Sequence, residues 1–306
     1  MLHKVYLPFS ENDLREHFVQ SDKDSGNIDK HIAKYKKSIK NYLLYETNIP
    51  FEEDIKLIRQ IEKDETFWTA SSLMTLFHSA DRDRELIKLL TLAFGEKPPL
   101  DNFTDWNNCL NGELFLFFEP NIPSPKVYLD WLKDNAIVQN FIPYIIEKAR
   151  NKKGDFRSDL EGATNVDALI INSTNGFAVV IEAKVLSDIS YQVSYDSMRN
   201  QIIRNIDVML SRNDDLAVPL NKRNPDNSLF LLLTPKLYKD NPRTRLYGHT
   251  FRDYKNDVQT IKKDLAHRKL DEKQCESISK RIGWITWEDL KTINSNCCKW
   301  ITQNNK

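Results

Sequence analysis

The chain has 306 residues, of which 40% are hydrophobic and 29% are charged, and its 44 Lys and Arg balance 44 Asp and Glu. A chain without net charge excludes a histone-like polycation, so any nucleic-acid surface has to be a local patch. The four cysteines form no CxxC pair, and no apolar run is long enough for a membrane span or a signal-peptide core. The sequence therefore predicts a soluble cytoplasmic protein of two domains, or of one domain with a large extension, without a zinc finger or a disulfide framework.

The N-terminal part of the chain, over residues 10–95, has the spacing of amphipathic helices. Segments such as "NDLREHFVQ", "EEDIKLIRQIEKDE" and "RDRELIKLLTLAF" place their apolar residues three or four apart. A short apolar segment, "ELFLFF", follows, and the three prolines between residues 120 and 125 favour a linker. We therefore expect a mostly helical region of unknown role over residues 1–120 and a second domain over residues 126–306.

The second domain alternates between helical and strand patterns. A helix over "VYLDWLKDNAIVQNFIPYIIEKA" precedes two apolar runs, "VDALIIN" and "FAVVIEAKV", that are joined through Asn175-Gly176. An Asn-Gly pair between two such runs favours a β-hairpin, because its turn needs positive φ angles. A helix, a strand ("SLFLLLT"), a charged helical stretch over residues 249–269 and "RIGWITWEDLKTI" complete the chain. In that last segment a strand turns into a helix with Thr286 as N-cap. This order predicts an α/β fold.

Three charged residues interrupt the apolar runs of the expected hairpin. If the turn has two residues, Asp167 lies opposite Lys184, and if it has four residues, Asp167 lies opposite Glu182. Both loop lengths put the three side chains on one face of the sheet, since side chains alternate with a period of two. Two carboxylates at cross-strand separation can share one Mg²⁺ or Mn²⁺ ion, which prefer oxygen ligands. The lysine beside them can orient or help deprotonate a metal-bound water, or stabilise charge on a phosphate.

These residues carry a resemblance to a known family. Asp167, followed after the hairpin by the Glu-Ala-Lys run 182–184, resembles the D-x(n)-(D/E)-x-K signature of the PD-(D/E)xK nuclease superfamily. The proline of that signature is absent, because Val166 precedes Asp167. Over roughly residues 130–290 the order of elements is similar to the αβββαβ core of that superfamily. The resemblance implies a restriction-endonuclease-like fold, with a central mixed sheet flanked by helices, that follows the helical N-terminal region.

The resemblance also implies further site residues. Gln201 and Arg204, in "RNQIIRN", are similar to the Q-x-x-R pattern that some branches carry on the next helix. With Asn205 they share one helix face. A further acid comes from the first core helix in the family, and both Glu147 and Glu161 are candidates for it.

The function that the resemblance implies is that of a metal-dependent nuclease, a phosphodiester hydrolase acting as an endonuclease. Asp167 and Glu182 would hold Mg²⁺ or Mn²⁺, and Lys184 would help to activate the attacking water. Nucleic acid is the expected partner, with DNA favoured and a restriction-like or defence role, and no membrane partner is expected. A second copy of the chain is a further candidate partner, as a homodimer. The alternative is a non-catalytic nucleic-acid- or protein-binding module built on the same fold.

Basic residues gather after the expected "SLFLLLT" strand. Arg243, Arg245, Arg252 and Lys255 lie in a stretch where Lys and Arg outnumber Asp and Glu. This cluster fits a surface that follows phosphates. It fits an ordinary solvated helix equally well, and the sequence leaves the two interpretations open.

Overall fold

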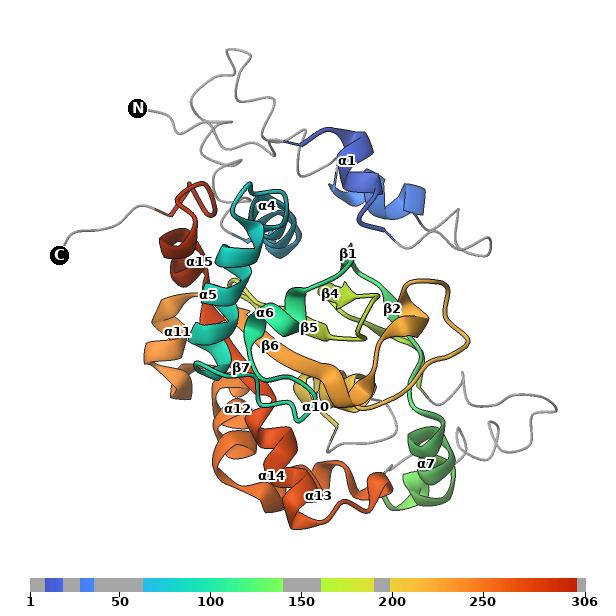
Figure 1. Cartoon of the computed structure of the whole chain (residues 1–306). Helices are drawn as coiled ribbons and strands as arrows, with labels where there is room; N and C mark the ends of the chain where they lie inside the picture. The colour runs from blue at the N-terminus through green and yellow to red at the C-terminus, as the bar shows by residue number, and fades with distance from the viewer. Residues whose placement is uncertain (1–8, 19–27, 36–62, 140–160, 190–198, 302–306) are drawn as a thin grey trace.

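A five-stranded mixed sheet forms the centre of the described part of the protein (Figure 1). The computed structural model describes residues 9–18, 28–35, 63–139, 161–189 and 199–301. Across the sheet the strands are β1 (Leu114–Phe118), β4 (Ala168–Asn172), β5 (Ala178–Ala183), β6 (Ser228–Thr234) and β7 (Ile282–Thr286). The pairs β1–β4 and β4–β5 are antiparallel, whereas β5–β6 and β6–β7 are parallel. A two-stranded sheet pairs β2 (Asn121–Ile122) with β3 (Thr164–Asn165).

Helices cover both faces of the sheet, so the expectation of an α/β fold with a flanked mixed sheet is confirmed. Residues of the first face share one core cluster with α4 (Glu65–Phe77), α5 (Arg82–Phe94), α6 (Trp106–Leu110) and α15 (Trp287–Ile293). Residues of the second face share another with α10 (Gln201–Met209), α12 (Leu246–Asn256), α13 (Val258–Asp264) and α14 (Glu272–Lys280). Further α-helices of the described part are α1 (Glu11–Arg15), α7 (Lys126–Gln139) and α11 (Lys236–Asp240).

Strand β5 shows how the sequence builds this sandwich of layers. All six of its residues are buried. Val179 and Ile181 pack into the first core cluster, whereas Ala178 and Val180 pack into the second. By the same alternation Glu182 lies on the α10 side of the sheet, with an exposed fraction of 0%. A charged side chain in this position requires partners, because an isolated buried charge costs several kcal/mol.

The sheet crosses the boundary that was expected between residues 120 and 126. The segment "ELFLFF" contains β1, which pairs along its whole length with β4, from Leu114 opposite Asn172 to Phe118 opposite Ala168. Helices α4 and α5 pack on the same sheet. The chain on both sides of the proline-rich segment therefore contributes to one sheet and to one core.

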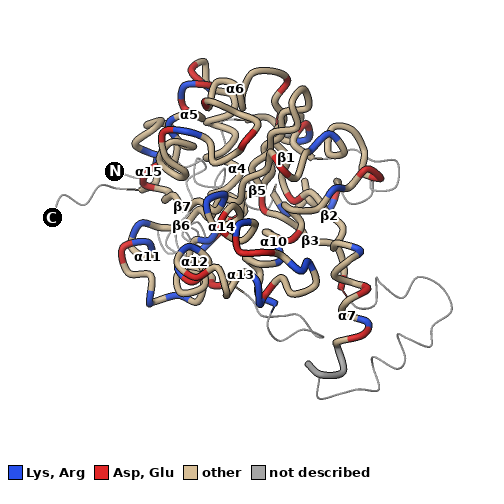
Figure 2. The backbone as a smooth tube through the Cα atoms, turned by 60° about the horizontal axis from the view of Figure 1, so that its bottom comes forward, with Lys and Arg blue, Asp and Glu red and all other residues tan. Residues whose placement is uncertain are grey.

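Helix caps set the bounds of two expected helical segments. Thr286 caps α15 in a capping box with Asp289, as expected. The charged stretch over residues 249–269 is divided, because Asp257 ends α12 and its side chain caps α13. Charged residues of both signs are spread over the outer helices (Figure 2). None of the helices in the described ranges combines the length and the apolar character that a membrane span requires.

Candidate active site

The hairpin between β4 and β5 sets the spacing of the candidate residues. Its turn takes the four residues 173–176, and the strands pair Ala168 with Ile181. One step further in the same register, Asp167 lies opposite Glu182. Of the two loop lengths that the sequence left open, the structure has the four-residue loop. Asp167 is also tied to the neighbouring strand, since its Oδ2 accepts a hydrogen bond of 2.8 Å from the Ala183 N–H.

The Lys184 ammonium lies at the centre of the site. Its Nζ donates to Glu182 Oε1 and to the carbonyl oxygen of Ala183. It lies 3.9 Å from Asp167 Oδ2 and 3.5 Å from Glu65 Oε1. The structure thus brings together Asp167, Glu182 and Lys184, as the period of the strands requires, and it adds a third carboxylate.

That third carboxylate, Glu65, comes from the first residue of α4. Asp64 caps this helix, so Glu65 stands in its first turn, where the helix dipole stabilises a negative charge. Its Oε2 accepts hydrogen bonds from the Val185 N–H, at 3.0 Å, and from the Ser187 hydroxyl. The helix start is therefore fastened to the end of β5, beside Lys184.

The sequence analysis missed Glu65 because it placed this residue at the end of a helix over residues 52–65. Nine of the 13 residues of α4 are buried, so the helix shows no clear division into an apolar and a polar face. The pair Asp64-Glu65, an N-cap residue followed by an acid in the first turn, was the signal that marks a helix start here.

Asn205, on α10, contacts the site from the second face of the sheet. Its Nδ2 donates to Glu182 Oε2 at 2.7 Å, and its exposed fraction is 0%. Both oxygens of the Glu182 carboxylate are thus bound, one by Lys184 and one by Asn205. The Asn205 Oδ1 is buried and has no hydrogen-bond partner among the described residues. An amide in this position fixes the orientation of the carboxylate.

The other expected site residues lie elsewhere. Glu161 forms ion pairs with Arg199 Nε, at 2.9 Å, and with Arg204 Nε, at 3.3 Å, and is not brought to the three carboxylates. Arg204 also donates to the carbonyl oxygens of residues 162 and 163. Gln201 is half-buried at the start of α10 and makes no described hydrogen bond with the acids. Glu147 lies outside the described residues.

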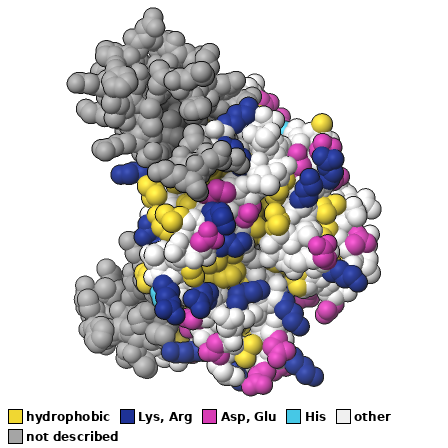
Figure 3. Space-filling view, turned by 90° about the vertical axis from the view of Figure 1, so that its left-hand side faces the viewer, with side chains coloured by type: hydrophobic (Ala, Val, Ile, Leu, Met, Phe, Trp, Pro, Cys, Tyr) yellow, Lys and Arg dark blue, Asp and Glu magenta, His cyan; other side chains and the backbone are white. Residues whose placement is uncertain are grey.

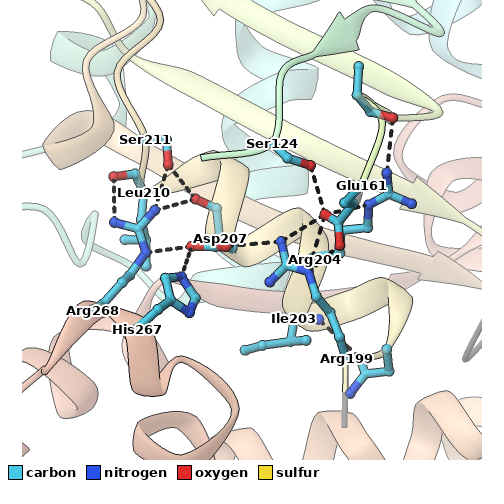
Figure 4. A network of polar contacts seen from close by, with 12 residues as sticks. Ser124, Glu161, Arg199, Ile203, Arg204, Asp207, Leu210, Ser211, His267 and Arg268 are labelled. Carbon is cyan, nitrogen blue, oxygen red and sulfur yellow. Dashed lines mark hydrogen bonds and ion pairs between the residues drawn. The ribbon is translucent and has the colours of Figure 1, made fainter. Parts of the chain in front are cut away.

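Glu161 belongs instead to a buried polar network on the outer side of α10 (Figure 4). Arg199 links it to Asp207, whose Oδ2 lies 3.0 Å from Arg199 Nη2. His267 and Arg268 contact the other oxygen of Asp207. Hydrogen bonding from His267 and the charges of Arg199 and Arg268 hold the pKa of Asp207 well below its usual value in spite of its burial. The network fastens α10 to two neighbouring segments, so it explains the charged residues of α10 that do not reach the site.

The charges of the site do not balance. Loss of water and the Glu182 carboxylate raise the pKa of Asp167 well above its usual value, against the opposing effect of Lys184. Burial likewise raises the pKa of Glu182. Burial acts to lower the pKa of Lys184, but the three carboxylates outweigh it and raise that pKa. When all three acids are ionised, their negative charge exceeds that of the one ammonium, and a divalent cation would neutralise the excess and favour the ionised forms.

The donor set fits Mg²⁺ or Mn²⁺ in its chemistry, because it consists of carboxylate oxygens with excess negative charge. Glu65 and Asp167 also line a cavity of about 130 Å³, together with Lys34 and Glu119. Within the described ranges, no group of three His, Cys, Asp or Glu side chains is already arranged to hold a metal ion. The carboxylates surround the Lys184 ammonium, so a metal ion could bind them only if the ammonium moved away from its present contacts.

Comparison with protein-family models, with curated proteins and with solved structures gives no match to this chain. No relative therefore assigns a role to Glu65, Asp167, Glu182 or Lys184. Their function has to be inferred from their chemistry and their positions.

Proposed function

We propose that the protein is a metal-dependent nuclease, a phosphodiester hydrolase that acts on nucleic acid. The observation that carries this proposal is the convergence of Glu65, Asp167 and Glu182 on Lys184, from two strands and the start of a helix. Three acids and one lysine in a largely buried position are costly for folding. A hydrolytic site needs such residues, because it has to bind both a cation and a phosphate.

Each side chain has a distinct role in the proposed reaction. Asp167 and Glu182 would hold Mg²⁺, with Glu65 as a further ligand, and the ion would supply Lewis-acid chemistry and lower the pKa of the attacking water. Lys184 donates hydrogen bonds and positive charge to the phosphate oxygens, where negative charge increases in the transition state. Asn205 keeps one oxygen of Glu182 in place. The Asp167 carboxylate is positioned by the Ala183 N–H.

The order of elements supports the restriction-endonuclease-like fold that the sequence resembles. Helices α4 and α5, the antiparallel strands β1, β4 and β5, the helix α10 and the parallel strand β6 come in this order along the chain, apart from α6 before β1 and the segment with β2, α7 and β3 between β1 and β4. This is an αβββαβ order, in which Glu65 stands on a helix before the first strand. DNA is the favoured substrate, in a restriction-like or defence role, by the same resemblance.

One observation favours a different function. The Lys184 ammonium neutralises part of the carboxylate charge by itself, so the four side chains also make a sensible ion network without metal. In that case the protein is a non-catalytic module that binds nucleic acid or protein. Metal-dependent activity separates the two functions.

Cleavage of mixed nucleic-acid substrates by the purified protein tests the proposal. Single- and double-stranded DNA and RNA are incubated with Mg²⁺, with Mn²⁺ and with EDTA. We expect cleavage by the wild type only with metal, and a loss of at least about 100-fold in Asp167→Asn. Glu113→Gln, a change of an exposed acid at the opposite end of the hairpin, is the matched control and should cleave like the wild type. Equal cleavage by Asp167→Asn and by the wild type would locate the activity elsewhere.

A further inference from the structure

The loop that follows β5 connects the candidate site to the start of α12. At one end, Glu65 accepts hydrogen bonds from Val185 and Ser187. At the other end, Asp188 accepts hydrogen bonds from the backbone N–H groups of Leu246, at 2.9 Å, and Tyr247, at 3.2 Å. The surface around α11 and the first turn of α12 therefore begins only a few residues from Lys184.

This surface carries exposed leucines. Leu186 is 45% exposed, Leu237 64% and Leu246 48%, and these three make up half of the six most exposed large hydrophobic side chains among the described residues. Asp188, two residues after Leu186, accepts the hydrogen bond from the Leu246 N–H, and the ring contact of Tyr238 with Tyr247, with centroids 6.3 Å apart, joins α11 to α12. We call these three side chains the leucine patch. Exposed apolar side chains that gather in one place mark a binding surface.

Two arginines lie beside the leucine patch. Arg243 is exposed, and Arg245 stacks on the Tyr238 ring with its guanidinium carbon 4.1 Å from the ring centre. Arg245 also donates to the Tyr238 hydroxyl. Among the described residues neither guanidinium forms an ion pair, whereas Lys236 pairs with Asp240 at 3.2 Å. The face that carries α11 and α12 shows hydrophobic side chains beside Lys and Arg (Figure 3).

We propose that the leucine patch, with Arg243 and Arg245, binds the nucleic-acid strand next to the bond that is cleaved. This inference rests on the proposed nuclease function. The guanidinium groups contact phosphates, and the leucines contact bases that are separated from their neighbours, in the way that apolar wedges open a base step. Nucleic acid fits this surface because its charge complements the unpaired arginines and because the surface adjoins the site through one short loop.

Binding in EDTA, where no cleavage occurs, tests the proposal independently of catalysis. Fluorescence anisotropy of labelled single- and double-stranded DNA is measured for the wild type, the double variant Leu237→Ala/Leu246→Ala and Arg243→Ala. Val127→Ala is the control, because Val127 is 54% exposed on α7, which lies on the opposite side of the molecule from α11 (Figure 1). We expect affinity to fall on the order of tenfold in the leucine double variant and to stay unchanged in the control. Arg243→Ala should remove about one phosphate contact, so the slope of log K against log[salt] should become less steep by about one.

A second readout identifies the leucine contact itself. 2-Aminopurine in the DNA should become brighter with the wild type, because the base loses its stacking, and not with the leucine double variant. Unchanged affinity and fluorescence in that variant would overturn the proposal, even if the protein cleaves DNA. Binding of a polyglutamate peptide in place of DNA would overturn it in favour of an acidic protein partner. Patch-dependent DNA binding without any metal-dependent cleavage would support the patch and refute the nuclease function.

Discussion

The Glu65→Gln variant tests the residue that joins the site from outside the hairpin. Glu65 Oε1 lies 3.5 Å from Lys184 Nζ, and two unit charges at this distance interact by about 5 kcal/mol at an effective dielectric constant near 20. The side chain is 27% exposed, and the other two carboxylates repel it, so most of this attraction is offset. We expect the free energy of unfolding in EDTA to change by less than about 1 kcal/mol.

The affinity for metal should change much more in this variant. Loss of one charged ligand should raise the dissociation constant for Mn²⁺ by about 10- to 100-fold. Since binding to the folded state stabilises by RT ln(1 + [L]/Kd), the stabilisation by saturating Mn²⁺ should be about 1.4–2.7 kcal/mol smaller than in the wild type. For a chain of 306 residues this corresponds to a thermal shift that is about 2–4 °C smaller.

Thermal unfolding with increasing Mn²⁺ measures both quantities in one experiment. Glu113→Gln removes an exposed acid that contacts Ser173, so it should behave like the wild type at every Mn²⁺ concentration. The same Mn²⁺-dependent shift in Glu65→Gln and in the wild type would show that Glu65 is not a ligand. A loss of more than about 3 kcal/mol in EDTA would contradict the charge balance described for the site.

Three further variants probe the charges around α10 and β5. Lys184→Met leaves three acids without their ammonium, so it should abolish hydrolysis. It should also lower the free energy of unfolding in EDTA by about 3–5 kcal/mol. An unchanged free energy of unfolding would mean that the acids are protonated. Asn205→Ala should weaken Mn²⁺ affinity by about tenfold in calorimetry, because Glu182 loses one of its two partners; unchanged affinity would leave Lys184 as its sole support. Asp207→Asn should destabilise by about 3–5 kcal/mol near pH 7, against less than about 1 kcal/mol for Asp240→Asn in an exposed pair. The folded state lowers the pKa of Asp207, so its contribution to the free energy of unfolding is fully present above the unfolded-state pKa near 4. That contribution is lost as the pH falls through the folded-state pKa. Both variants should therefore have the same stability as the wild type in strong acid.

Much of the sheet and part of the site could be predicted from the sequence. The strand β6 coincides with the run "SLFLLLT", since a strand buried on both faces is continuously apolar. The common face of Asp167, Glu182 and Lys184 followed from the period of two and did not depend on the loop length. The register itself depended on the loop length, which Asn175-Gly176 alone did not decide.

The remainder depended on contacts between distant parts of the chain. Glu65 and Lys184 are 119 positions apart, and no local pattern indicates that the start of α4 meets the end of β5. Glu161 was a sensible candidate by its position before β4, but two arginines compete for its carboxylate. The proline-rich segment resembled a domain linker, whereas it connects β1 of the central sheet to α7. The pairing of β1 with β4 shows that the chain on both sides of this segment belongs to one sheet. No pattern in the sequence near the prolines indicates this pairing.

Anomalous diffraction from crystals soaked in Mn²⁺ tests the central claim most directly. The proposal predicts one anomalous peak bound by the carboxylates of Asp167, Glu182 and Glu65, at about 2.0–2.2 Å from their oxygens. It also predicts that the Lys184 ammonium has moved away from Glu182 to make room for the ion. A structure without a peak at these carboxylates, in which Lys184 still contacts all three acids at a saturating Mn²⁺ concentration, would contradict the claim and favour the non-catalytic module.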